Sequence, residues 1–287
     1  FRRVLFRSQV LDGIYTLKFE KAIAHRCNRQ YAISVNSATQ GLIFAIRATT
    51  PEGSAVLIPA VSFAATLNAP LQALRRPVIC DTDFTGLLDL DSMQSSLKHS
   101  GVGTVMYVNL YGNCVDYDRL RLYTEFFNDN LVVIEDAAQS FGASYRGRPS
   151  GSMGDISVLS FDPTKNLNNY GSGGMILTDD VYQNSLFRDL RDNGKTNHHD
   201  FAGTNSKMSE ADCAQMLVKL KYFDSWQQRR REIAEYYSDQ LSRYVDVPAV
   251  TLGTVHAWSK YVIRVRNRAA LHTRSEEHTS ELQSHSF

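Results

Sequence analysis

The sequence has no excess of either charge. Its 287 residues include 31 Lys and Arg and 30 Asp and Glu, giving a net charge of +1. Without a strongly basic surface, neither a nucleic acid nor an anionic membrane is expected as its main partner. The most apolar stretch, residues 55–71, is interrupted by Pro59, Pro70 and polar residues, so it lacks the ~20 apolar residues of a membrane-spanning helix. No signal peptide is visible, and we therefore expect a cytoplasmic protein with no membrane partner.

Cysteine is scarce and widely spaced. The chain has no C-x-x-C pair and no histidine at zinc-finger spacing from its four cysteines, Cys27, Cys80, Cys114 and Cys213. A disulfide framework and a structural zinc site are therefore not predicted. We expect reduced, mostly buried thiols. The run His198–Asp200 is better explained as a polar loop than as a metal site, because adjacent side chains in a strand would point to opposite faces.

The glycine motifs of two common nucleotide-binding loops are missing. Gly171, Gly173 and Gly174 do not have G-x-G-x-x-G spacing, and they precede a predicted strand rather than a helix. A nicotinamide-dependent oxidoreductase would need that motif. The sequence Gly194-Lys195-Thr196 resembles the end of a P-loop, but Asp189 stands where its first glycine should be. Neither loop is predicted.

What is present is the composition of an ordinary globular protein, with 43% hydrophobic and 21% charged residues. The length suits one large domain or two ordinary ones. Short β-branched runs predict buried strands at residues 56–59, 77–83, 104–110, 131–137, 156–161 and 175–179. Helices are predicted between them at residues 38–49, 64–74, 91–98 and 117–128. This alternation predicts an α/β fold with a largely parallel sheet and a site beyond the carboxyl ends of its strands.

The C-terminal third has a different pattern. A long stretch of helix formers without Pro or Gly follows Met208, and Ser209 with Asp212 resembles a capping box that would begin a helix there. Its charged residues are expected to form a solvated face. The run from His256 to Asn267 is predicted to be a strand.

Two strand ends carry the residues of chemical interest. Asp136 ends one apolar strand and is followed by Gln139, whereas Ser160 ends the next and is followed by Lys165 and a glycine-rich turn. Taken alone, Asp136 could equally cap a following helix, and Lys165 could be an ordinary surface lysine. A lysine held in a pocket at such a strand end could instead form a Schiff base.

Six segments, taken in order, resemble the DegT/DnrJ/EryC1/StrS family of sugar aminotransferases between about Leu17 and about Arg268. They are NSATQGL (36–42), IPAVSFAAT (58–66), VNLYG (108–112), IEDAAQSFGA (134–143), GDISVLSF followed by TKNL and GSGG (154–174), and GTNSKMSEADCA (203–214). Each segment is weak alone, but their order and spacing are specific. The resemblance implies an aspartate-aminotransferase-like large domain of fold type I with a mostly parallel seven-stranded sheet, plus part of a small C-terminal α+β domain.

The resemblance also implies a cofactor, pyridoxal 5'-phosphate, and roles for individual residues. Lys165 would be the catalytic lysine that bonds the cofactor aldehyde and moves protons. Asp136 would pair with the pyridinium nitrogen. The other expected cofactor contacts are Gln139 at the ring oxygen, Phe63 stacked on the ring, and Ser160, Ala38 and Thr39 at the phosphate. Asn205 matches a phosphate contact donated by the neighbouring subunit, which implies a homodimer with shared active sites.

Three positions depart from the family pattern. Ala38 replaces a glycine in the phosphate turn, which should be tolerated if its φ is negative. Ser172 replaces an acid, and Asn109 replaces a histidine. We expect these last two changes to affect substrate contacts more than cofactor binding. Lys165 argues against the branch of the family that has histidine there and dehydrates sugars.

The function implied is transfer of an amino group from L-glutamate, which becomes 2-oxoglutarate, to a nucleoside-diphosphate keto-sugar for polysaccharide or secondary-metabolite biosynthesis. The alternative is a non-catalytic family member that binds pyridoxal phosphate or a sugar nucleotide in a regulatory role. We expect a cofactor domain at residues 9–222 and a partial small domain at 223–272. Residues 1–8 and 273–287 resemble translated adapter or vector sequence. On this interpretation the chain is a C-terminally truncated fragment whose own activity the sequence leaves open.

Overall fold

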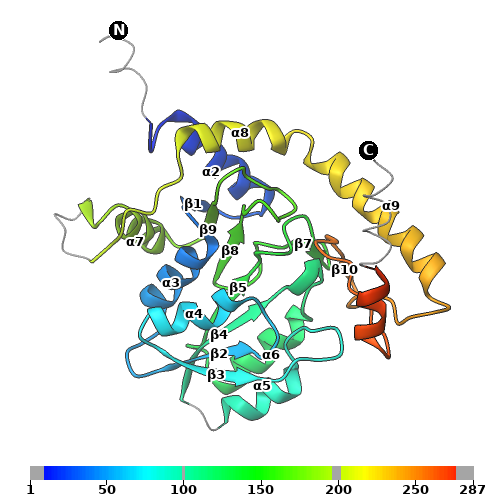
Figure 1. The fold of residues 1–287 in the computed structure, drawn as a ribbon. Coiled ribbons are helices and arrows are strands. Elements are labelled where there is room, and N and C mark those ends of the chain that lie inside the picture. Colours follow the sequence, from blue (N-terminus) through cyan, green and yellow to red (C-terminus); the bar gives the residue numbers. More distant parts are fainter. Residues whose placement is uncertain (1–9, 99–100, 196–201, 276–287) are drawn as a thin grey trace.

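A seven-stranded sheet lies between two layers of helices (Figure 1). The structure is a computed structural model that describes residues 10–98, 101–195 and 202–275. In the order β1-β9-β8-β5-β4-β2-β3, the strands are β1 Tyr31–Val35, β9 Gly174–Thr178, β8 Ile156–Ser160, β5 Val132–Asp136, β4 Val102–Val108, β2 Ala55–Pro59 and β3 Arg76–Cys80. The six strands predicted from the sequence are confirmed, and β1 is an additional one.

Strand β9 runs antiparallel to both of its neighbours, whereas the other strands are parallel to one another. The predicted α/β class with a mostly parallel sheet is thus confirmed. The register places Val108 beside Asp136 and Asp136 beside Val158. The carboxyl ends of β4, β5 and β8 therefore meet at one edge of the sheet, where ligands bind in open α/β folds.

Buried strand residues alternate between the two faces of the sheet, and each face has its own helices. One face packs against α3 Ala38–Thr49, α4 Ala64–Gln72 and α7 Val181–Arg191. On the opposite face, α5 Leu90–Leu97 and α6 Tyr117–Phe127 cover one half. The other half is covered by α2 Ile14–Arg26, α8 Glu210–Leu220 and the start of α9 Phe223–Leu241. Because both faces of the sheet are buried, the strands have continuous apolar sequences.

One feature expected from composition agrees with the structure. All four cysteines are free and buried, as predicted. No helix in the described ranges is long and apolar enough to cross a membrane.

The helical stretch after Met208 is divided rather than continuous. Ser209 caps α8 as predicted, since its hydroxyl accepts a hydrogen bond from the Asp212 N–H at 3.0 Å. The chain then turns at Lys221 and Tyr222 before α9 begins. This turn allows Phe223 to be fully buried against Phe141, with ring centroids 4.8 Å apart.

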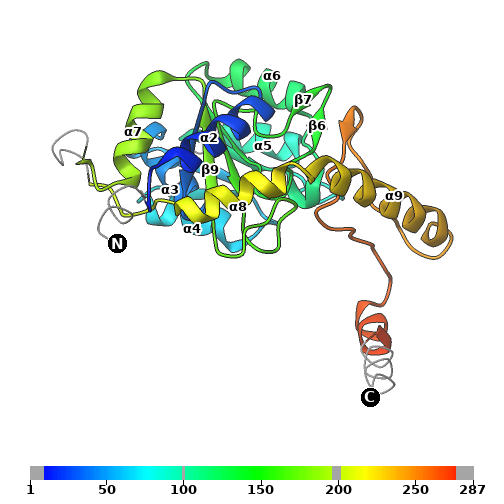
Figure 2. The ribbon, with the colours of Figure 1, turned by 90° about the horizontal axis from the view of Figure 1, so that it is seen from above.

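The strand predicted from His256 to Asn267 is wrong. The paired strand is only β10 Thr254–Val255, which joins β6 Ser144–Tyr145 and β7 Arg148–Pro149 in a small second sheet. Trp258 interrupts the run with a left-handed φ of 49°, and the following N–H groups bond to the loop around Tyr111. Beyond Arg264 the chain extends away from the body of the molecule (Figure 2). The predicted domain boundary at residue 222 stays a prediction.

Candidate active site

A cavity of about 490 Å³ opens where β5 and β8 end and α3 begins. Seven of the predicted site residues line it together: Ala38, Thr39, Phe63, Asp136, Gln139, Ser160 and Lys165. They come from four separate stretches of the chain, so the sheet and its connections bring them into one place. Sequence reasoning did not single out other lining residues, among them Ser37, Ser62, Tyr111, Asp162, Ser259 and Lys260.

Asp136 lies buried at the carboxyl end of β5. Its Oδ1 accepts a hydrogen bond from the Ala138 N–H at 3.1 Å, and its Oδ2 accepts one from the Thr66 hydroxyl at 3.4 Å. Residues 138–142 form turns, not a helix, so the helix-cap interpretation is excluded. Burial raises the pKa of Asp136, and the Ala138 N–H and the positive charge of Lys165 oppose that rise. A buried carboxylate of this kind favours a positively charged partner.

Lys165 follows β8 and faces the same cavity. Burial lowers the pKa of its ammonium group, while the carboxylates of Asp136 and Asp162 act in the opposite direction. Lys260, which also lines the cavity, lowers the Lys165 pKa further by repulsion. The Lys165 Nζ lies 5.9 Å from the centroid of the Phe63 ring. A lysine with a lowered pKa is more often neutral, and the neutral amine is the form that attacks a carbonyl.

The part of the cavity wall at the start of α3 is suited to an anion. Ser37 caps α3, and the first helical residues Ala38 and Thr39 line the cavity at the helix N-terminus, where free N–H groups and the helix dipole attract negative charge. Ala38 begins the helix without a positive φ, so its replacement of the family glycine is tolerated, as expected. The Ser160 hydroxyl lies at the end of β8 in the same wall.

Gly174 lies close to both the end of β8 and the start of α3. It pairs with Ser160 on one side and Val35 on the other. A Cβ atom at this position would lie only 2.6 Å from the Ala38 nitrogen and from the Ser37 carbonyl carbon. Only a residue without a side chain allows β9 to lie this close to the start of α3.

Replacing Gly174 with alanine should therefore displace the start of α3 and weaken both the fold and anion binding. Overpacking of this kind typically costs about 1–3 kcal/mol. Thermal unfolding and the Kd for pyridoxal phosphate would measure the two effects. Gly171→Ala is the matched control in the same turn, because the nearest atom to its Cβ would be 3.7 Å away. Equal behaviour of the two variants would contradict the role given to Gly174.

Gln139 is held in one orientation by the loop around Tyr111. Its Oε1 accepts a hydrogen bond from the Tyr111 N–H at 3.0 Å, which leaves its amide N–H groups to donate into the cavity. Tyr111 has a left-handed φ of 60°, and its carbonyl accepts hydrogen bonds from the N–H groups of Ser259 and Lys260 at 2.9 and 3.2 Å. Residues 257–260, which we call the C-terminal strap, are thereby fixed over the site.

His256 precedes this strap and is buried. Its Nδ1 accepts a hydrogen bond from the Trp258 N–H at 2.8 Å, and burial lowers its pKa from 6.5 to about 4. An unfolded chain binds a proton at this histidine near pH 6.5, whereas the native chain does not. Above pH 6.5 the group has no effect, and the free energy of unfolding should fall by up to about 3 kcal/mol as the pH drops to 4.

This pH dependence can be measured by urea unfolding at pH 7.5 and pH 5. His256→Gln should flatten the slope relative to the unsubstituted protein, because glutamine keeps an acceptor but takes up no proton. Parallel slopes for the two proteins would show that His256 does not cause the loss of stability.

Asn109 does not have the position expected of a substrate contact. It is fully buried and outside the lining of the cavity. Its Nδ2 donates to Glu135 Oε1 at 2.9 Å, and its Oδ1 accepts from the Val115 N–H at 3.0 Å. The expectation that Asn109 alters substrate contacts is therefore wrong, since this side chain stabilises a buried carboxylate behind the site. Ser172, in contrast, does line the cavity.

Asn205 is the predicted site residue that lies outside the cavity of its own chain. It is exposed and forms a β-bridge with Asp192. Its role in a neighbouring subunit stays a prediction. The run His198–Asp200 lies outside the described residues. Within the described ranges, no group of three or more metal-ligating side chains comes together.

Comparisons with known proteins agree with this geometry. The model of the DegT/DnrJ/EryC1/StrS aminotransferase family matches residues 1–285. The dTDP-3-amino-3,6-dideoxy-alpha-D-galactopyranose transaminase of Aneurinibacillus thermoaerophilus is 34% identical over 273 residues, which span 93% of this chain and 74% of the relative. The chain is thus similar to about three quarters of a transaminase whose name specifies a nucleotide-linked amino sugar.

Two solved structures extend the likeness to the fold. DesV of S. venezuelae, in complex with a ketimine intermediate, has a TM-score of 0.90 at 29% identity and covers 96% of this chain and 76% of its own. NtdA of Bacillus subtilis, with the bound cofactor PMP, has a TM-score of 0.82 at 28% identity, with coverages of 92% and 62%. The predicted fold and cofactor class are confirmed, and the chain belongs to the DegT/DnrJ/EryC1/StrS aminotransferase family.

Proposed function

We propose that this protein transfers an amino group from L-glutamate to the keto group of a nucleotide-linked sugar, with pyridoxal phosphate as its cofactor. The observation that carries the proposal is the meeting of Asp136 and Lys165 in one cavity with an anion site beside them. The reaction would serve the synthesis of surface polysaccharides or secondary metabolites.

The lining residues match the functional groups of pyridoxal phosphate. Asp136 supplies a buried carboxylate for the ring nitrogen, and the Gln139 amide supplies a donor for the ring oxygen. Ser160, with the free N–H groups of Ala38 and Thr39, would hold the phosphate. Phe63, exposed at the cavity wall, offers a ring face for stacking. When bound, the cofactor withdraws electrons from the carbon that carries the amino group.

The protein's own residues would orient the substrate and move the proton. Asp136 would hold the cofactor through its ring nitrogen and would favour the protonated form of that nitrogen, because a buried carboxylate is stabilised by a positive charge beside it. The Lys165 Nζ would accept the proton lost by the substrate carbon and would donate it again within the same site. Its lowered pKa brings the amine closer to the working pH, which makes it a better general base.

A glutamate half-reaction tests the proposal directly. Protein loaded with pyridoxal phosphate should convert L-glutamate to 2-oxoglutarate in the absence of sugar, as the cofactor absorbance changes to that of the pyridoxamine form. The amount formed should equal the number of loaded sites, because no acceptor is present. Cofactor binding without any 2-oxoglutarate would favour the alternative, a regulatory protein that binds the cofactor but does not use it.

We also propose that the active sites are shared in a homodimer. Val61, Phe63, Leu67, Leu71 and Leu74, at the start of α4 and along it, are all at least 40% exposed, and Ser62 and Phe63 line the cavity. An apolar surface next to a ligand site suits a subunit interface. Asn205 is exposed and would contact the partner's phosphate.

Mixing inactive Lys165→Ala and Asn205→Asp proteins should restore activity if each mixed dimer forms one intact site. No recovery of activity after proven subunit exchange would argue against shared active sites.

A further inference from the structure

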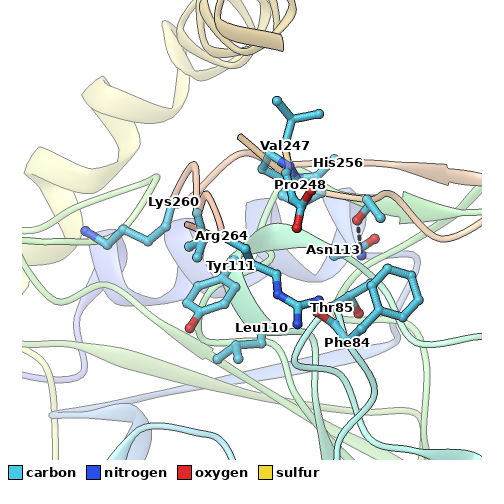
Figure 3. Close-up of a pocket in the computed structure, with 13 residues that line it drawn as sticks. Phe84, Thr85, Leu110, Tyr111, Asn113, Val247, Pro248, His256, Lys260 and Arg264 are labelled. Carbon is cyan, nitrogen blue, oxygen red and sulfur yellow. Dashed lines mark hydrogen bonds between the residues drawn. The ribbon is translucent and has the colours of Figure 1, made fainter. Parts of the chain in front are cut away.

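A second cavity adjoins the candidate active site. Its volume is about 240 Å³, and it shares Tyr111 and Lys260 with the first cavity. Its other walls include Phe84 and Thr85 in the loop after β3, Val247 and Pro248, and Arg264 (Figure 3). We call it the Arg264 cavity. Tyr111 and Lys260 thus stand between the two cavities.

The two cations of this region are free to bind an anion. The Arg264 side chain extends toward Phe84 and Thr85, and Lys260 extends to the other side of Tyr111 (Figure 3). Among the residues that the structure describes, the Arg264 guanidinium makes only a long hydrogen bond, 3.5 Å, to the Phe84 carbonyl. Across the described ranges, neither Arg264 nor Lys260 forms an ion pair with a carboxylate. Unpaired cations on a cavity wall attract carboxylate or phosphate groups.

The other charged and titratable groups of the cavity define how selective this attraction is. Asp246 also lines it, and its main chain exchanges two hydrogen bonds with that of Arg264, at 3.0 and 3.2 Å. Its carboxylate would repel an anion. His256 is buried and neutral at physiological pH, so it adds no charge. The net charge that an anion would meet in this cavity therefore depends on Arg264, Lys260 and Asp246.

We propose that the Arg264 cavity binds the diphosphate of the nucleotide-linked substrate, with Arg264 on its wall and Lys260 on the wall that it shares with the active site. This inference rests on the proposed function, because it assumes a sugar nucleotide as the acceptor. The reacting sugar would occupy the first cavity, and the diphosphate would lie beyond Tyr111. The apolar walls of Phe84, Pro248 and Val262 suit a flat nucleoside better than they suit the short polar chain of glutamate.

The test is calorimetric binding of uridine diphosphate and of inorganic pyrophosphate to protein already loaded with pyridoxal phosphate, so that the cofactor's phosphate site is filled. Arg264→Gln should raise the Kd at least about tenfold, the loss expected for one charge-assisted hydrogen bond. Lys260→Met should act in the same direction. Asp246→Asn should lower the Kd, because it removes a repulsive charge.

Arg266→Gln is the matched control, since Arg266 is exposed on the same segment but does not line the cavity. Equal Kd values for the Arg264 and Arg266 variants, or no binding of either probe to the unsubstituted protein, would overturn the proposal. The glutamate half-reaction separates the remaining outcomes. If Arg264→Gln raises the KM for glutamate by the same factor, the cavity belongs to the amino donor and the diphosphate assignment is wrong. If the half-reaction is normal but neither uridine diphosphate nor pyrophosphate binds, the aminotransferase proposal stands and only the diphosphate site is ruled out.

Discussion

Lys165→Ala should lower the rate of the glutamate half-reaction by at least about 10⁴-fold, because the protein loses both its carbonyl-binding amine and its general base. Pyridoxal phosphate should still bind through Ser160 and the start of α3, with a higher Kd. Borohydride should no longer fix the cofactor to the protein. These three effects together distinguish a catalytic lysine from one that only contributes charge.

Lys221→Ala is the appropriate control for this experiment. Lys221 is exposed at the end of α8 and is not part of the cavity, so both trapping and rate should be unchanged. Covalent trapping of the cofactor by the Lys165 variant at the original level would mean that another amine, such as Lys260, holds the aldehyde. The assignment of Lys165 would then have to be withdrawn.

Asp136→Asn should reduce the rate by about 10²- to 10³-fold, the size of effect seen when one preorganised electrostatic partner is removed from an active site. Asparagine has nearly the same shape and can still accept a hydrogen bond from Thr66, but it cannot stabilise a protonated ring nitrogen. Burial raises the pKa of Asp136, which means that its ionised form is disfavoured by the fold. Its neutralisation should therefore leave the thermal stability unchanged or increase it.

Comparing the rates of Asp136→Asn and Asp162→Asn shows whether the site needs a carboxylate at Asp136 or only negative charge nearby. Asp162 lines the same cavity, but its carboxylate already accepts hydrogen bonds from the N–H and hydroxyl of Thr164, at 3.0 and 2.8 Å. Its removal should slow the reaction less than tenfold, as expected for a partly solvated charge. Similar losses in the two variants would show that the cavity needs negative charge in general and not a carboxylate at Asp136.

The parts of this protein that depend on local pattern could be predicted from the sequence. The buried strands have uninterrupted apolar runs, and Asp136, Ser160 and Lys165 stand at or just after the ends of two of those strands. The order of short motifs then indicated the family, and the resemblance implied the roles expected of Phe63, Gln139 and Ala38, all of which line the cavity. These residues are specified by neighbours a few positions away, so their places in the fold can be inferred before any tertiary contact is known.

The residues that escaped prediction depend on contacts between distant parts of the chain. Tyr111 lines the site because Gln139, 28 positions later, fixes its N–H, and because Ser259 and Lys260 bond to its carbonyl. The strand predicted after His256 fails for the same reason, since those N–H groups bond to the Tyr111 loop and not to a sheet. Asn109 stands at a family position that is usually histidine, but the buried Glu135 that it contacts gives no local signal.

The left-handed turn at Tyr111 also connects the ligand to the far end of the chain. Its N–H is bonded to Gln139, a residue assigned to the cofactor, and its carbonyl is bonded to the C-terminal strap. Any ligand that tightens Gln139 in its present orientation must also tighten the docking of the strap, and the coupling is reciprocal by thermodynamic necessity. Cofactor loading should therefore slow amide hydrogen exchange at residues 257–260, although none of their N–H groups need touch the cofactor.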